Sequence, residues 1–248
     1  MIDRPKNLPS SALFTHARAN RVDESNLILL WALCSYGDEL VLATSLGPQS
    51  LVILDLLAMT GHKVRTLMLD TGLLFKETLE LKERVQDHFD IEIESVRPKL
   101  TFDEIEEKHG SFLWEREPGK CCAMRKVEPL GRALEGAKAW ITGIRRSHSA
   151  GRAQAEPVEW DHQYGLAKVN PLISWTREEV MEHLESRGVP FNPLLKEGYP
   201  SVGCMPCTSQ VSARDAAFDE RAGRWAGTGK TECGLHRGTV FAEDRETL

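Results

Sequence analysis

The chain has 248 residues, of which 41% are hydrophobic and 27% are charged. This length suffices for one large α/β domain, and no apolar run approaches the roughly 20 residues that a membrane-spanning helix needs. The formal net charge of -6 argues against broad binding to nucleic acid, which requires a basic surface. The polar N-terminus lacks the apolar stretch of a signal peptide, so we expect a cytoplasmic protein with no membrane and no nucleic-acid partner.

Strand-like and helical patterns alternate along most of the chain. Strands are predicted at 38–45, 63–70, 91–98, 137–144, 156–161 and 166–172. Helices are predicted at 50–61, 74–90, 102–110, 124–136 and 176–189, the last of which begins with a capping box of Thr176 and Glu179. Repeated β-α-β units predict an α/β fold with a doubly wound, mostly parallel sheet and helices on both faces.

Three segments follow predicted strands at the edge where parallel sheets bind ligands: 44–50, 69–72 and 142–153. The first, TSLGPQS, contains Gly47, and the next helix begins there with backbone N–H groups that suit an anion. A plain β-α turn is the alternative. The segment GTGKT at 227–231 resembles the end of a phosphate-binding P-loop, but Arg224 stands where that motif requires glycine, so we reject it.

The six cysteines are not expected to form disulfides in a reducing cytoplasm. Cys34 lies in an apolar helical pattern, 27–37, and is expected to be buried. Four others form the pattern CC…CxxC: Cys121, Cys122, Cys204 and Cys207. Zinc sites usually take CxxC twice, whereas adjacent cysteines can reach two corners of a larger [4Fe–4S] cluster. The pattern therefore favours a cluster, with zinc and redox thiols as alternatives.

The sequence beyond residue 208 is polar and rich in glycine, with little periodicity. We therefore expect one α/β domain, residues 1–208, and a mobile C-terminal arm, residues 209–248. Cys233 lies on this arm in the polar segment KTECGLH, whose basic residues favour a thiolate: Lys230, His236 and Arg237. A lone thiolate on a mobile arm suits a nucleophile that must meet two partners, and an incidental exposed cysteine is the alternative.

Several basic residues stand beside the cysteine motifs or after a predicted strand: Arg125, Lys126, Arg145, Arg146, Arg152, Arg221 and Arg224. This placement predicts a pocket for a small anion. Solvated surface charges are the alternative, and they account for most of the 31 lysines and arginines of the chain.

Together these motifs resemble the iron–sulfur adenylylsulfate (APS) reductases, which belong to the assimilatory sulfonucleotide (APS/PAPS) reductases. The resemblance runs from about residue 38 to residue 240 and rests on TSLG, LDTGLLFKET, CCAMRKVEPL, TGIRR, NPLISWTREEV, GYPSVGCMPC, RAGRW and ECGLH. It implies an adenine nucleotide alpha-hydrolase-like fold. It also implies reduction of APS to sulfite and AMP for sulfate assimilation and cysteine biosynthesis, with thioredoxin (or glutaredoxin) as electron donor.

The resemblance assigns roles to residues as well. Cys233 would attack the sulfur of APS and become an S-sulfocysteine, while the four cysteines of CC…CxxC would hold a [4Fe–4S] cluster. Substrate contacts are implied for Thr44, Ser45, Leu46, Gly47, Leu69, Lys126, Thr142, Gly143, Arg152, Arg221, Arg224 and His236. Lys126, next to the cysteine pair, is expected to couple the cluster electrostatically to the substrate.

The sequence departs from the family pattern at a few positions. Gln49 in the first loop resembles the cluster-free phosphoadenylylsulfate (PAPS) reductases, and His148 and Gly151 replace the usual Gln and Thr. A cluster-bearing PAPS reductase is therefore the nearest alternative. An ATP-dependent tRNA sulfur transferase is more distant, because its S-G-G-x-D-S loop is absent, and a zinc-binding interaction module is a third alternative. The sequence leaves open whether the chain forms a homo-oligomer.

Overall fold

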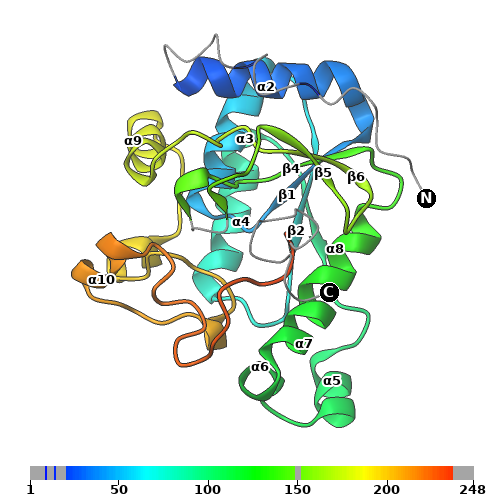
Figure 1. Cartoon of the computed structure of the whole chain (residues 1–248), viewed down its shortest axis with the longest axis vertical. Coiled ribbons are helices and arrows are strands. Elements are labelled where there is room, and N and C mark those ends of the chain that lie inside the picture. Colours follow the sequence, from blue (N-terminus) through cyan, green and yellow to red (C-terminus); the bar gives the residue numbers. More distant parts are fainter. Residues whose placement is uncertain (1–8, 10–13, 15–20, 149–151, 237–248) are drawn as a thin grey trace.

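The computed structural model describes residues 9, 14, 21–148 and 152–236. It contains a six-stranded sheet with the order β3-β2-β1-β4-β6-β5 (Figure 1). The strands are β1 (Leu40–Thr44), β2 (Arg65–Leu69), β3 (Ile93–Val96), β4 (Ala139–Ile141), β5 (Val158–Asp161) and β6 (Leu166–Val169). Every neighbouring pair is parallel except β5 and β6. The predicted mostly parallel α/β sheet is confirmed.

Helices lie before, between and after the strands in the sequence. They are α2 (Arg21–Tyr36), α3 (Pro48–Thr60), α4 (Lys76–Phe89), α5 (Phe102–His109), α6 (Leu113–Arg116), α7 (Pro118–Cys122), α8 (Glu128–Ala133), α9 (Arg177–Arg187) and α10 (Ala213–Phe218). The capping box predicted for α9 is present. The helix expected at 124–136 begins earlier, at Pro118, and runs through a π-helical segment, Ala123–Val127, that joins α7 to α8.

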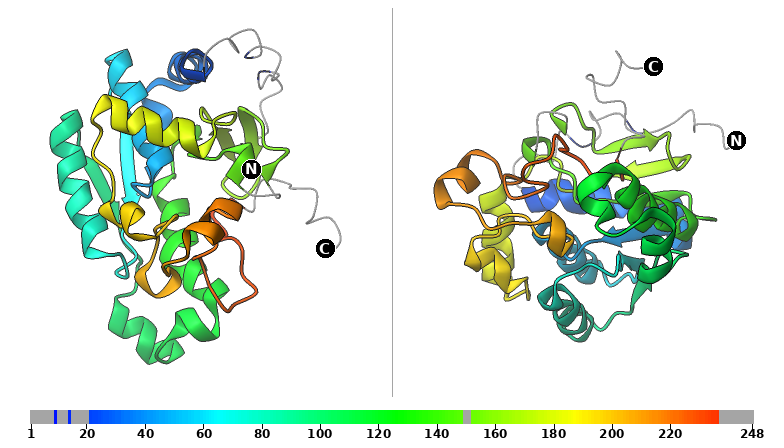
Figure 2. Two further views of the ribbon diagram at one scale, coloured as in Figure 1. Left: turned by 90° about the vertical axis from the view of Figure 1, so that its left-hand side faces the viewer. Right: turned by 90° about the horizontal axis from the view of Figure 1, so that it is seen from below.

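Helices cover both faces of the sheet (Figures 1 and 2), because successive side chains of a strand point to opposite sides. Leu40 and Leu42 of β1 belong to a core cluster shared with α2, α3, α4 and α9. Val41, between them, belongs to a second cluster with Trp140 of β4 and Leu130 of α8. The strands are therefore buried on both faces, as a doubly wound fold requires.

The strand order reverses at β1. From β1 the chain adds β2 and β3 on one side, and it then returns to place β4 on the other side. Loops that leave β1 and β4 therefore diverge at their carboxyl ends and open a crevice, which is where doubly wound sheets bind ligands. Two of the three segments expected to bind ligand, 44–50 and 142–153, start at this crevice.

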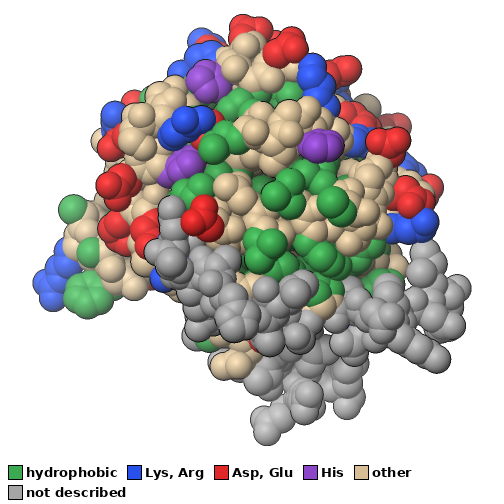
Figure 3. All heavy atoms as spheres, turned by 90° about the horizontal axis from the view of Figure 1, so that it is seen from above, with side chains coloured by type: hydrophobic (Ala, Val, Ile, Leu, Met, Phe, Trp, Pro, Cys, Tyr) green, Lys and Arg blue, Asp and Glu red, His purple; other side chains and the backbone are tan. Residues whose placement is uncertain are grey.

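One expectation about α2 is wrong. Cys34 is exposed, because the buried face of the helix carries Ile28, Leu29 and Ala32. Leu27 and Leu30, which share the outward side with Cys34 at helical spacing, are 39% and 44% exposed. Figure 3 views the molecule from the α2 side and shows hydrophobic side chains gathered on this face.

The C-terminal segment packs back onto the domain (Figures 1 and 2). Thr208 forms an isolated β-bridge with Arg224, and Ser209 N–H donates to Gly223 O at 2.9 Å. Gly223 is required there, because a Cβ atom would lie 2.2 Å from Ser209 O. Division of the chain after residue 208 stays a prediction, and residues 237–248 of the expected arm, with Arg237, lie outside the described residues.

Among the described residues, none of the helices has the length and apolar character needed to cross a lipid bilayer.

Candidate active site

A cavity of about 220 Å³ lies at the carboxyl ends of β1, β2 and β4. Its wall contains the expected nucleophile, Cys233, and eleven of the expected substrate-binding residues: Thr44, Ser45, Gly47, Leu69, Lys126, Thr142, Gly143, Arg152, Arg221, Arg224 and His236. The structure thus brings residues from both ends of the chain to one site. Their contact with a substrate stays a prediction.

Leu46 is the residue of the expected set that the structure places elsewhere. Its backbone is left-handed, with φ of +54°, and its side chain is 2% exposed within the hydrophobic core. The Leu46 N–H donates to Thr44 Oγ1 at 2.8 Å, which fixes this turn. Leu46 therefore shapes the loop and does not line the cavity.

The loop between β1 and α3 is rigid and open to a ligand. Thr44 Oγ1 donates to Ser50 Oγ at 2.7 Å, and Ser50 Oγ lies 2.9 Å from Gly47 O. The N-cap residue Gly47 offers no side chain to the first N–H groups of α3, so these groups remain open to a ligand. Gly143 lies against this helix, because a Cβ atom there would be 2.9 Å from Gln49 Cβ.

Positive charge dominates another part of the cavity wall. The basic side chains that line it are Lys126, Arg152, Arg177, Arg221 and Arg224. Glu220 is the one carboxylate on this wall among the described residues, and it forms an ion pair with the fully buried Arg145. The cavity therefore suits a ligand that carries negative charge.

Ion pairs and ring contacts hold these arginines in place. Arg152 donates to Glu232 at 2.9 Å and to His148 Nδ1 at 2.9 Å. Arg221 donates to the same Glu232 carboxylate at 3.3 Å and lies over the Trp225 ring at 5.4 Å. Because Glu232 bonds both, two guanidinium groups from distant parts of the chain are kept side by side.

Both histidines of the cavity are neutral. Burial, with the charge of Arg152, lowers the pKa of His148 to about 2, so its Nδ1 is available to accept from Arg152. Burial, with the nearby Lys168 ammonium, lowers the pKa of His236 well below its usual value. The His236 ring stacks on Trp140 with centroids 5.4 Å apart, so it offers an apolar face and an uncharged ring.

The four cysteines of CC…CxxC line a second, smaller cavity, closed by apolar side chains that include Leu73, Trp114 and Trp225. Cys121 and Cys122 end α7, whereas Cys204 is the N-cap of a short 3-10 turn, Met205–Cys207, that ends with Cys207. This turn is fixed to the loop after β2, because Met205 N–H donates to Leu73 O at 2.7 Å. All four thiols are free of disulfide bonds.

Burial and neighbouring charges shift the pKa of these four thiols. Burial and the neighbouring thiols raise the pKa of Cys121 to about 11 and also raise the pKa of Cys122 and Cys207. Burial opposes ionisation of Cys204 too, but Lys126 and the Thr71 hydroxyl outweigh it and lower its pKa. In the part of the chain that is described, no three His, Cys, Asp or Glu side chains are grouped to hold a single ion. The four thiols share one small cavity.

Lys126 lies on the walls of both cavities. It belongs to the π-helical segment, where adjacent basic residues point to different partners. Arg125 donates to Thr71 O at 2.9 Å and lies over the Phe102 ring at 5.2 Å. Burial lowers the pKa of Lys126, but its interactions with Cys204 and Cys233 outweigh burial and raise that pKa. Lys126 is thus placed between the cysteine centre and Cys233.

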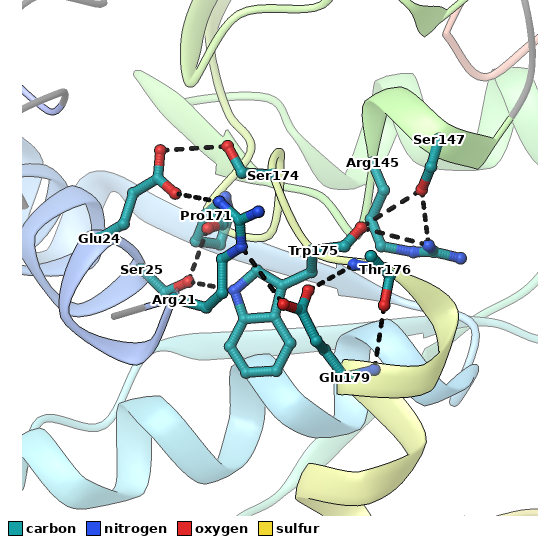
Figure 4. Close-up of polar contacts among 10 residues, drawn as sticks. All are labelled: Arg21, Glu24, Ser25, Arg145, Ser147, Pro171, Ser174, Trp175, Thr176 and Glu179. Carbon is teal, nitrogen blue, oxygen red and sulfur yellow. Dashed lines mark hydrogen bonds and ion pairs between the residues drawn. The ribbon is translucent and has the colours of Figure 1, made fainter. Parts of the chain in front are cut away.

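A buried polar network anchors the loop after β4 to α2 and α9 (Figure 4). Trp175 Nε1 donates to Ser25 Oγ at 2.8 Å, and Ser25 Oγ donates to Pro171 O at 2.8 Å. Arg145 donates to Trp175 O at 3.3 Å and to Ser147 Oγ at 2.8 Å. This network fixes Arg145, which in turn holds Glu220 of the C-terminal segment.

The sequence matches the profile of a known protein family. The profile of the phosphoadenosine phosphosulfate reductase domain matches residues 39–210, which is more than half of the chain. The chain belongs to this reductase family. The family profile ends before Cys233.

The relatives of this reductase-family chain carry two substrate names. The adenosine 5'-phosphosulfate reductase of Oceanobacillus iheyensis is 45% identical, over 86% of this chain and 90% of its own. Adenosine 5'-phosphosulfate reductase 1 of Bacillus subtilis is 44% identical, over 84% and 89%. The phosphoadenosine 5'-phosphosulfate reductase of Gloeobacter violaceus is 45% identical, over 84% and 87%.

Solved structures agree with the fold of the reductase family. The phosphoadenylyl-sulfate reductase of Candida auris, in a phosphate complex, superposes with a TM-score of 0.68 at 29% identity, over 84% of this chain and all of that one. The FMN adenylyltransferase of Candida glabrata reaches a TM-score of 0.58 at 15% identity, over 83% and 67%, and shares the fold alone.

Some residues of the site in this reductase-family chain gave no clear sequence signal. Glu220 and Glu232 pair with arginines 75 and 80 positions away. Arg177 lines the cavity from the first turn of α9, and Trp140 lines it from the centre of a buried strand. Glu232 stands inside the motif ECGLH, directly before the cysteine, and Arg177 stands inside NPLISWTREEV, but neither motif indicated the contacts of these side chains.

Proposed function

We propose that the protein reduces APS to sulfite and AMP, with Cys233 as the nucleophile and thioredoxin (or glutaredoxin) as the electron donor. The observation that carries this proposal is that Cys233 lines the same cavity as five basic side chains and the loops at the strand ends. Relatives named adenosine 5'-phosphosulfate reductase support the choice of substrate.

The chemistry is a pair of displacements at sulfur. The Cys233 thiolate attacks the sulfur of APS, so that an S–S bond forms, the S–O bond breaks and AMP leaves with the electron pair. The product on the enzyme is S-sulfocysteine. A thiolate of the donor then attacks the Cys233 sulfur, sulfite leaves with its electron pair, and the second donor thiol resolves the mixed disulfide. The donor dithiol supplies both electrons.

The cavity provides what an anionic nucleophile and an anionic substrate require. Lys126, Arg152, Arg221 and Arg224 offset the charge of the phosphosulfate and the charge that develops on the leaving phosphate. The loops after β1 and β4, which contribute small side chains and backbone groups, hold the nucleoside. The neutral ring of His236 lies near Trp140 and adds no charge of its own.

The cysteine centre completes the proposal. Cys121, Cys122, Cys204 and Cys207 would hold a [4Fe–4S] cluster, each thiolate binding a different iron. When bound, such a cluster would supply a charged centre beside Lys126, while the donor dithiol provides the electrons. Lys126 therefore holds its charge between the two sites.

A second substrate is favoured by one observation. Gln49, which resembles the PAPS-type loop, lines the cavity, and the Gloeobacter violaceus relative is named for PAPS. The two substrates differ by a 3′-phosphate. Kinetics that separate the two nucleotides therefore test the choice of APS.

The deciding experiment compares kcat/KM for APS and for PAPS, with thioredoxin present and protein purified without air. We expect APS to be preferred and the preparation to hold about four irons and four sulfides per chain. Preference for PAPS would replace the substrate. Reduction of neither nucleotide by an iron-loaded preparation would contradict the proposed function.

A further inference from the structure

Glu232, the residue before Cys233, occupies the hydrogen-bond donors of two cavity arginines. Its carboxylate accepts from Arg152 at 2.9 Å and from Arg221 at 3.3 Å. Glu232 itself is not part of the cavity wall, so it reaches these guanidinium groups from the rim. The Glu232 carboxylate therefore occupies N–H donors that a ligand in the cavity would also use, but it does not fill the cavity itself.

The two sides of this contact differ in burial. The side chains of Arg152 and Arg221 are 6% and 14% exposed, whereas the side chain of Glu232 is 34% exposed. Other groups also fix the arginines: His148 accepts from Arg152, and Thr231 O accepts from Arg221 at 3.0 Å. The arginines are thus fixed parts of the site. The carboxylate is already partly hydrated, so it can leave the arginines for water more easily than they can leave it.

The carboxylate does not satisfy all the donors it meets. Arg152 Nε is buried and has no hydrogen-bond partner among the described residues. A carboxylate has two oxygens, whereas a phosphosulfate presents more oxygens and more negative charge to the same donors. The arginine pair is therefore better matched to the larger anion than to Glu232.

We propose that Glu232 is a positioning residue that competes with the substrate's phosphosulfate for Arg152 and Arg221. The inference rests on the proposed function and adds a step to it. Substrate binding displaces the carboxylate, and because Glu232 and Cys233 are adjacent, this displacement moves the backbone that carries the thiol. Without substrate, Glu232 holds the C-terminal segment on Arg152.

The other acid of this segment behaves differently. Glu220 pairs with Arg145, which is 0% exposed and also donates to Trp175 O and Ser147 Oγ. Arg145 is absent from the cavity wall, so a ligand in the cavity does not compete for it. Glu220 keeps the segment attached while Glu232 exchanges with substrate.

The test measures binding without turnover. In full-length protein carrying Cys233→Ser and purified without air, we compare the affinity for APS and for adenosine with and without Glu232→Gln. We expect Glu232→Gln to tighten APS binding about tenfold, because the competing charge is lost, and to leave adenosine binding unchanged. Glu232→Ala should act in the same direction, whereas Glu232→Asp keeps the charge and should stay near the parent value.

Glu94→Gln is the matched control, since Glu94 pairs with Arg65 at 2.7 Å on β3 and does not line the cavity. It should change neither affinity. With Cys233 intact, Glu232→Gln should lower KM for APS more than it changes kcat, whereas a purely structural role would weaken binding.

Unchanged or weaker APS binding in both Glu232→Gln and Glu232→Ala would overturn the inference while leaving the proposed function intact. Equal tightening of APS and adenosine would overturn it as well. Failure of the Cys233→Ser parent to bind APS at all would overturn the proposed function and this inference together.

Discussion

The two halves of the cavity wall are built in different ways. The strand-end half, from the loops after β1 and β4, uses small residues and backbone groups that the sheet fixes, such as Gly47 and Gly143. The C-terminal half, from residues 209–236, brings Arg221, Arg224 and Cys233 on a segment that has little regular structure. The strand-end half is thus part of the sheet scaffold, whereas the C-terminal half adds Cys233 and two arginines to the basic side chains that the rest of the domain supplies.

The C-terminal half is attached to the domain differently from a core element. It is held by the polar contacts of Glu220, Glu232 and Lys230, the last of which donates to Pro118 O at 3.0 Å. Few apolar side chains of the segment are buried, with Trp225 at 4% exposure as the main one. Segments held by polar contacts open at lower cost than core elements, which would let Cys233 meet first a nucleotide and then a protein thiol in the proposed reaction.

The largest effect is expected where the two halves meet the cysteine centre. Lys126→Ala should slow S-sulfocysteine formation about 100-fold, because it removes the ammonium that lies near both Cys204 and Cys233. Rapid-quench measurement with APS would show this. Lys120→Ala is the control, since Lys120 lies six residues earlier on α7 and pairs with Glu117 at 3.6 Å. A near-normal rate for Lys126→Ala with its iron intact would contradict the role of Lys126.

A smaller effect should separate the two halves. Gly203→Ala would place a Cβ atom 2.3 Å from the Arg224 guanidinium, which must then move. We expect about tenfold weaker binding of APS and unchanged binding of adenosine, because only Arg224 in the C-terminal half is disturbed. Gly229→Ala, where a Cβ atom meets nothing within 4 Å, is the control. Loss of adenosine binding in Gly203→Ala would show that the two halves are not separable.

A matching substitution disturbs the strand-end half of the cavity wall. Gly143→Ala would bring a Cβ atom to 2.9 Å from Gln49 Cβ and push the loop after β4 away from α3. Binding of both adenosine and APS should weaken by about threefold to tenfold, since one packing clash costs about 1 kcal/mol. Isothermal titration of each ligand measures this. An effect confined to APS would place the nucleoside elsewhere.

Whether the sequence predicts a residue of the cavity wall depends on the kind of contact that the residue makes. Strand ends could be located because apolar runs mark parallel strands, and ligands gather at their carboxyl ends. The CC…CxxC pattern likewise located four residues that share a cavity. Contacts between distant polar groups left no such mark, which is why the Glu220–Arg145 and Glu232–Arg152 pairs were not predicted.

Local backbone geometry limited the prediction as well. Leu46 was expected to contact substrate, but its left-handed backbone turns the side chain into the core. The π-helical segment that gives Arg125 and Lys126 different partners has no simple sequence pattern. Cys34 was expected to be buried, and only the phase of α2 against the sheet decides that it is exposed.

The smallest expected effect concerns stability alone. Thr176→Ala removes the capping box of α9, in which Glu179 N–H donates to Thr176 Oγ1 at 3.2 Å. The free energy of unfolding should fall by about 1 kcal/mol with little change in kcat, because α9 contributes to the cavity wall without carrying the nucleophile. Denaturant unfolding measures this. Thr101→Ala, at the capping box of α5 away from the cavity, should cost a similar amount; a selective loss of activity in Thr176→Ala would extend the catalytic region to α9.

The most direct test of the division between the two halves is the site of the covalent intermediate. Iron-loaded protein incubated with APS and no thiol donor should gain one SO3 group, located by peptide mass spectrometry on Cys233 in the C-terminal half. Cys233→Ser should gain none, and added thioredoxin should remove the group from the wild-type protein and release sulfite. A stable sulfonate on Cys121, Cys122, Cys204 or Cys207, or one that persists in Cys233→Ser, would contradict the account.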